Sequence, residues 1–119
     1  MLDLVNQERT SRGIAPLVAD PALERVARLK AQDMIDNGYF DHTSPTYGSP
    51  FDMMKAAGIN YGYAGENLAG APSVDSAHQN LMNSPGHKAN ILNTNYTHVG
   101  IGVVDGGPYG KMFVQEFTD

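Results

Sequence analysis

Residues 83–93 read NSPGHKANILN, and the expected fold rests on this stretch more than on any other. Ser84 followed by Pro85 is typical of a helix start, with Ser84 as the N-cap and Pro85 as the first helical residue. His87 then falls in the first turn, where the positive end of the helix dipole disfavours a second positive charge. We therefore expect His87 to stay neutral, the form in which an imidazole binds metals or accepts protons.

The length and composition of the chain narrow the classes of protein to consider. The 119 residues suit one domain, residues 1–119, with one core. A net charge of -5 without any basic run argues against a nucleic-acid partner. No apolar stretch reaches the roughly 20 residues of a membrane span. The chain has no cysteine, which excludes disulfides and thiolate metal sites.

Hydrophobic spacing and breaker residues predict helices in the first two thirds of the chain and strands mainly at its end. The longest expected helix follows Asp20 and ends at Gly38. In 97–105, Gly100 and Gly102 alternate with apolar residues, which leaves one face of that strand open to a neighbouring backbone. This order favours an α+β fold. The other expected elements are helices over 2–12, 51–57 and from Ser73 to Met82, an extended segment over 62–70, and a strand over 111–117.

Three residues from distant segments form the candidate site. His42 lies in the polar loop YFDHTSPTYGSP (39–50), where binding groups are often found. Glu66 lies among small residues in AGENLAG (64–70), where a carboxylate is costly without a partner. With His87 they could form a site of two histidines and one carboxylate, as in some zinc hydrolases. They could equally form a hydrogen-bonded network without a metal.

The other candidate groups favour structural roles. His78 lies beside the apolar stripe of its helix and is expected to be half-buried. His98 begins a strand and is expected to be a solvated edge residue. No G-x-S-x-G elbow is present, so Ser84 is interpreted as a cap rather than a nucleophile. Glu66 has no second acid in a comparable glycine-rich setting, which argues against the paired carboxylates of glycoside hydrolysis.

Three motifs in this order resemble bacterial members of the CAP superfamily, which comprises cysteine-rich secretory proteins, antigen 5 and pathogenesis-related 1 proteins. The resemblance covers nearly the whole chain and implies an α-β-α sandwich with a small antiparallel sheet between helical layers. The motifs are DHTSP (41–45), GENLA (65–69) and NSPGHKANIL (83–92), supported by VNQER (5–9), GIAPL (13–17), VGIGVV (99–104) and FVQEF (113–117).

The resemblance also implies a central cleft with two histidines and two glutamates. His42, Glu66 and His87 match three of these four positions, and in several family members the two histidines hold a divalent metal, often zinc. The second glutamate should fall near Asn83 or Ser84, where this chain has its NSPG turn. These two residues are therefore expected beside the cleft, and a four-member acid–base site is not expected.

Three functions follow as hypotheses. The first is a secreted binding module, expected to be a monomer, whose cleft holds a divalent metal and an unknown lipid, peptide or cell-envelope ligand. The second is a metal-dependent hydrolase with Glu66 as the base. The third is a purely structural polar cluster. The missing glutamate favours binding over catalysis. Family members are usually secreted, so an extracellular or cell-envelope location is expected, although no signal peptide is visible in this chain.

Overall fold

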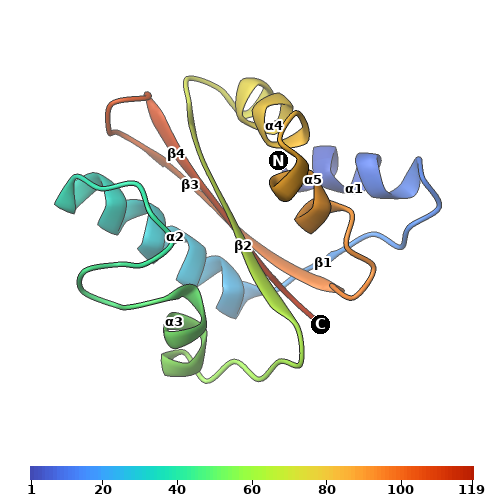
Figure 1. The fold of residues 1–119 in the computed structure, drawn as a ribbon, viewed down its shortest axis with the longest axis horizontal. Helices are drawn as coiled ribbons and strands as arrows, with labels where there is room; N and C mark the ends of the chain where they lie inside the picture. The colour runs from blue at the N-terminus through green and yellow to red at the C-terminus, as the bar shows by residue number, and fades with distance from the viewer.

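Two layers of helices enclose one small sheet in the computed structural model, which describes residues 1–119 (Figure 1). The predicted α-β-α sandwich is thereby confirmed. None of the helices is long and apolar enough to cross a membrane. The helices are α1 (Leu2–Thr10), α2 (Pro21–Asn37), α3 (Pro50–Ala56), α4 (Val74–Met82) and α5 (Pro85–Ile91), and the strands are β1 (Val18–Ala19), β2 (Ala64–Ala71), β3 (His98–Asp105) and β4 (Lys111–Thr118).

The sheet has the strand order β1-β3-β4-β2, so the last strand of the fold lies inside the sheet and β2 forms one edge. β4 pairs antiparallel with both β2 and β3, whereas β1 pairs parallel with β3. The sheet is therefore mixed rather than wholly antiparallel as expected. The sequence did not predict β1, because a strand of two residues is too short to show a periodic pattern. β1 also covers the start of β3, where Val18 lies opposite His98, so the expected edge position of His98 was wrong.

Helix α2 begins and ends where the sequence predicts. The Asp20 side chain accepts hydrogen bonds from the backbone N–H groups of Ala22 (2.8 Å) and Leu23 (3.4 Å), and Pro21 follows as the first helical residue. Gly38 ends the helix in the left-handed conformation (φ 64°), which glycine adopts without a steric penalty.

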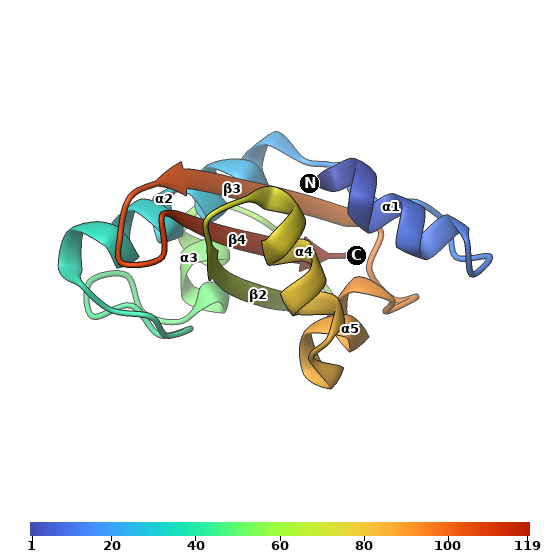
Figure 2. The ribbon, with the colours of Figure 1, turned by 90° about the horizontal axis from the view of Figure 1, so that it is seen from above.

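Glycines on β3 let α2 approach the sheet closely, as the alternating pattern predicts. A Cβ atom at Gly100 would lie 2.1 Å from the backbone carbon of Leu23, and one at Gly102 would lie 2.6 Å from that of Ala27. Since α2 packs across β3 and β4, its position relative to the sheet is set by direct backbone contact. Figure 2 shows α2 and α3 on one side of the strands and α1, α4 and α5 on the other.

The two faces of the sheet carry separate apolar cores. The core on the α2 side is small and contains Ala27, Ala31, Met34, Leu68, Met112 and Val114. The core on the opposite side is larger and contains Val5, Leu17, Ala69, Ala71, Ala77, Leu81, Ile91, Tyr96, Val99, Phe113 and Phe117.

A buried arginine joins the first helix to the segment that follows α5. The Arg9 guanidinium donates to the carbonyl oxygens of Ile91 (2.8 Å), Asn93 (3.0 Å), Tyr96 (3.1 Å) and Ala15 (2.8 Å). Its side chain is almost completely buried, so these bonds replace the hydration that it loses. The carbonyl group of Ile91, the last residue of α5, lacks a partner within the helix and is satisfied in this way.

The close contact between α2 and β3 predicts the effect of adding one methyl group. Gly100→Ala would push the new Cβ into the α2 backbone, and we expect it to lower the free energy of unfolding by at least about 1–3 kcal/mol. Gly86→Ala is the control, because a Cβ at Gly86 meets nothing within 4 Å. Its effect should stay within about 1 kcal/mol. Denaturant unfolding measures both, and equal stabilities of the two variants would contradict the packing described.

Candidate functional site

The loop that carries His42 is fastened to α2 by a buried carboxylate. Asp33 accepts hydrogen bonds from the Tyr39 hydroxyl, from Ser44 Oγ (2.6 Å) and from Asn37 Nδ2 (2.6 Å). Burial alone would raise the pKa of Asp33, but these three hydrogen bonds and the charge of Lys30 outweigh it and lower the pKa below its ordinary value. The loop is therefore attached at both sides of His42.

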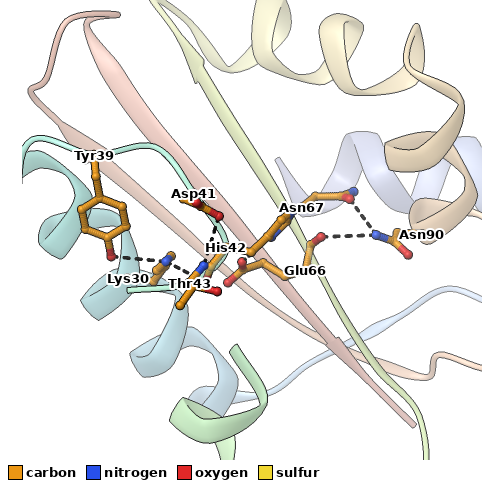
Figure 3. Close-up of polar contacts among 8 residues, drawn as sticks. All are labelled: Lys30, Tyr39, Asp41, His42, Thr43, Glu66, Asn67 and Asn90. Atoms are coloured by element: carbon orange, nitrogen blue, oxygen red, sulfur yellow. Dashed lines mark hydrogen bonds and ion pairs between the residues drawn. The ribbon is translucent and has the colours of Figure 1, made fainter. Parts of the chain in front are cut away.

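A buried lysine makes a second attachment. Lys30 is fully buried, and its Nζ donates to the backbone carbonyl of His42 (2.9 Å) and to the Tyr39 hydroxyl (3.2 Å), as Figure 3 shows. Nζ also lies 4.8 Å from the centre of the Tyr39 ring. Burial lowers the pKa of Lys30, and the nearby carboxyl groups, that of Glu66 first, oppose this shift. The ammonium group thus lies next to the acids of the site.

His42 and Glu66, predicted from distant motifs, are in direct contact. His42 Nδ1 lies 2.7 Å from Glu66 Oε1. Because a carboxylate oxygen only accepts, Nδ1 carries a proton, and in the neutral form of the ring Nε2 keeps a free lone pair. The Glu66 side chain is 1% exposed and that of His42 is 54% exposed. The pair therefore joins a buried charge to an imidazole that reaches solvent.

Helix α5 is fastened to the same strand from the other side of the sheet. Asn67 Nδ2 donates to the His87 carbonyl (3.1 Å) and to Gln115 Oε1 (3.1 Å). Asn90 Nδ2 donates to Asn67 Oδ1 (2.9 Å) and to the Glu66 carbonyl (3.3 Å), as Figure 3 shows. These amide groups fix α5, and hence His87, against the edge strand β2.

Ser84 has a different role from the one expected. It occupies the N-cap position of α5, but its side chain does not cap the helix. Its hydroxyl instead lies 2.9 Å from His87 Nδ1 and orients that ring. Asn83 ends α4 and its side chain is exposed in the same turn. Burial lowers the pKa of His87, and a positive charge on His42 would lower it further, so the neutral form expected from the sequence is favoured.

An open cleft of about 350 Å³ lies over the contact between His42 and Glu66. Its wall also includes Phe51, which is half-exposed and lies 6.4 Å from the Tyr61 ring, centre to centre. No three histidine, aspartate or glutamate side chains of the chain are grouped so that they could hold a metal ion. Glu66 is instead turned toward the His42 ring and the interior. The remaining lining residues are Thr43, Ser49 and Pro50.

A second buried acid, Glu116, was not predicted from the sequence. Glu116 on β4 lies directly opposite Glu66 on β2, and Glu116 is fully buried. The signal was present in the strand pattern, because alternate residues share a face and Glu116 therefore faces α2 together with Met112 and Val114. An acid in an apolar row is unusual and indicates a partner.

The other two histidines lie outside the cleft. His78 on α4 is buried and its Nε2 lies 3.9 Å from Glu8 Oε2, somewhat deeper than the half-buried position expected. His98 bonds through Nδ1 to the neighbouring Thr97 hydroxyl (2.8 Å) at the start of β3. Neither contacts His42, Glu66 or His87 in the structure. Of the three predicted site residues, His42 and Glu66 are in contact and line the cleft, whereas His87 on α5 is not among its lining residues.

An α-β-α sandwich with a histidine–carboxylate contact at the edge of its sheet defines the class of protein. The chain belongs to the CAP family: residues 2–117 match the model described as "Cysteine-rich secretory protein family".

Similar proteins occur in Bacillus. The chain is 50% identical over 118 residues to the "Uncharacterized protein YkwD" of Bacillus subtilis (strain 168), and the match covers 98% of this chain and 45% of that protein. It is 38% identical over 119 residues to the "Uncharacterized membrane protein YlbC" of the same strain, covering 98% of this chain and 34% of the relative. The chain thus spans less than half the length of these curated relatives.

Solved structures agree with the fold. An extracellular protein containing a SCP domain from Bacillus anthracis str. Ames superimposes with a TM-score of 0.89 at 36% identity, covering 98% of this chain and 38% of that one. An outer surface protein from Borrelia burgdorferi gives a TM-score of 0.91 at 22% identity, covering 99% and 88% of the two chains. At that identity the second likeness shows the fold alone.

The hydrogen bonds to Asp33 predict a pH-dependent contribution to stability. Asp33→Asn removes the charge that holds the His42 loop, and we expect it to lower the free energy of unfolding at neutral pH by about 1–3 kcal/mol. Because the folded pKa is lowered, this contribution is present above the unfolded value of about 3.9 and is lost as the pH falls through the folded value.

Denaturant unfolding at a series of pH values measures this difference, which should shrink below about pH 4. Asp36→Asn is the matched control on the same helix, because Asp36 is exposed and bonds only the exposed Gln32. Its effect should stay within about 0.5 kcal/mol at every pH. A difference for Asp33→Asn that does not change with pH would argue against the ionised carboxylate as its source.

Proposed function

We propose that this domain is the binding module of an exported or surface-exposed protein, and that its cleft holds a divalent metal between Nε2 of His42 and Nε2 of His87. Zinc commonly takes neutral imidazole ligands and leaves further tetrahedral positions open. The metal would act as a docking point for the ligand, whose oxygen or nitrogen atoms would complete the coordination.

The observation that carries this proposal is the way in which both histidines use Nδ1. His42 Nδ1 donates to Glu66, and His87 Nδ1 is bonded to Ser84 Oγ. Histidine ligands in proteins typically bond a carboxylate or another oxygen through the ring nitrogen that does not bind the metal. When His87 Nδ1 donates to Ser84, both Nε2 atoms have a free lone pair. The lowered pKa of His87 favours the neutral ring that a metal requires.

The number of protein ligands favours binding over hydrolysis. With two histidines, the remaining positions on a tetrahedral ion fall to water or to groups of the ligand. Glu66 is a poor candidate for a catalytic base, since Oε1 already bonds His42 and Oε2 is buried within the sheet layer. We therefore do not propose the metal-dependent hydrolase in which Glu66 takes a proton from water.

The walls of the cleft suggest the chemistry of the ligand. Phe51 offers an exposed aromatic face beside the polar groups, and Thr43 and Ser49 offer hydroxyl groups. A peptide or cell-envelope component that combines an anionic group with an apolar portion would fit such a surface. A location outside the cytoplasm is supported by the similar extracellular protein of Bacillus anthracis.

Calorimetric titration of zinc into the domain tests the proposal. The wild type should bind one zinc ion, and the double variant His42→Ala, His87→Ala should lose this binding. Ser84→Ala should weaken it by about 10-fold, because it removes the group that orients the His87 ring.

His98→Ala is the matched control, since His98 lies outside the cleft and should leave the affinity unchanged. Circular dichroism would establish that each variant is folded before titration. Equal zinc affinity in the wild type and in the double variant would reject the metal site and would favour the alternative in which the polar cluster only braces the fold.

A further inference from the structure

Glu66 and Glu116 form a pair of buried acids that the cleft itself does not use. They are register partners on the adjacent antiparallel strands β2 and β4, and both side chains face α2. Glu116 is fully buried and Glu66 is 6% exposed. Nothing in the proposed metal site requires Glu116, so its burial needs a separate explanation.

Three of the four carboxylate oxygens of this pair have no donor. Glu66 Oε2 and both oxygens of Glu116 are buried without a hydrogen-bond partner, whereas Glu66 Oε1 accepts from His42. Buried polar atoms are normally bonded, and two ionised carboxylates in contact would repel one another. A single proton between the two acids relieves both problems, because it halves the charge and turns one Glu116 oxygen into a donor for Glu66 Oε2, which leaves one buried oxygen of Glu116 without a partner.

The groups around the pair determine which acid holds the proton. On β3, Gly100 lies opposite Glu116 and contributes no side chain. On α2, Lys30 is the only nearby cation, and its Nζ donates to His42 and Tyr39 rather than to either acid. Glu66 already has His42 as a donor. Glu116 has no donor, so burying its ionised form would cost more free energy than burying its neutral form.

Electrostatics agree with this assignment. Burial raises the pKa of Glu116 well above its ordinary value, and the proximity and charge of Glu66 raise it further, whereas the charge of Lys30 lowers it. The charges of Asp33 and Asp41 also act on Lys30, so its single positive charge does not serve Glu116 alone.

We propose that Glu116 is a neutral carboxylic acid at physiological pH, and that its O–H donates to Glu66 Oε2. Glu116 is then a positioning residue: it holds the Glu66 carboxylate in the orientation that bonds His42. The protonation is independent of any metal. Its influence on zinc affinity rests on the proposed function.

Infrared spectroscopy of the apo domain tests the protonation directly. A protonated carboxyl group has a C=O stretching band that ionised carboxylates lack. At about pH 7 the wild type should show this band, and Glu116→Gln should remove it. Glu24→Gln is the control, because Glu24 is an exposed acid on α2 and its substitution should leave the band in place. Absence of the band in the wild type, or its persistence in Glu116→Gln, would overturn the proposal.

The pH dependence of stability gives a second readout. Because the folded pKa of Glu116 is raised, the wild type is stabilised by proton uptake below about pH 4.3 and loses this advantage as the pH rises toward the folded value. Glu116→Gln keeps a donor without needing a proton. Its thermal midpoint relative to wild type should therefore increase between about pH 4 and about pH 7. A constant difference would argue for an ionised or merely space-filling Glu116.

Zinc affinity then reports on the positioning role. Glu116→Gln retains an N–H donor for Glu66 and should bind zinc within about 3-fold of wild type, whereas Glu116→Met, of similar size but without a donor, should bind about 10-fold more weakly. Equal affinities of the Gln and Met variants would refute positioning. If wild type binds no zinc, the proposed function fails, and the infrared band still decides the protonation. If Glu116→Met does not fold, the infrared bands of the wild type and of Glu116→Gln still decide the protonation.

Discussion

The candidate site depends on one buried positive charge, that of Lys30. A fully desolvated ammonium group is costly unless it is hydrogen-bonded and near opposite charge, and both conditions are met here. Lys30 bonds the loop at His42 and lies near the acids Glu66 and Glu116. Its place on α2 is fixed in turn by the backbone contact between that helix and the glycines of β3. The packing of α2 on the sheet therefore sets both the position of the loop and the charge of the acids.

Two neighbouring residues on β2 hold the two segments that carry His42 and His87. Successive side chains of a strand point to opposite faces, so Glu66 points toward α2 while Asn67 points toward α5. Glu66 holds the His42 ring, and Asn67 bonds the His87 backbone. Segments from the two helical layers are thus brought together at one edge strand. The adjacent residues Glu66 and Asn67 of the GENLA motif each hold one of these segments.

Local signals in the sequence were sufficient for much of the fold but not for the surroundings of the site. The effects of Asp20, Pro21 and Gly38 are local, because each residue starts or ends the helix through its own neighbours in the sequence. Helix α2 therefore has the bounds that they predict. The Ser84 hydroxyl had two possible partners, and local rules did not indicate that it would bond His87 rather than cap its helix.

Long-range pairing explains the larger omissions. Glu116 faces Glu66 only because β2 and β4 pair in one register, and β1 is a strand only because β3 lies beside it. Such facts depend on residues that are distant along the chain, and the buried position of Glu116 could have been suspected only from the apolar row in which it lies.

The interior position of β4 has a consequence for how the domain folds. Both β2 and β3 pair with β4, and neither pairs with the other. Until residues 111–118 are available, the two earlier strands have no shared partner and the polar groups of β2 remain unpaired. The β3–β4 pair is a local hairpin, whereas the β2–β4 pair joins distant segments, and such long-range pairing slows folding relative to a chain built from local contacts. Without β4, the facing edges of β2 and β3 would expose unpaired backbone groups, the kind of edge at which chains aggregate.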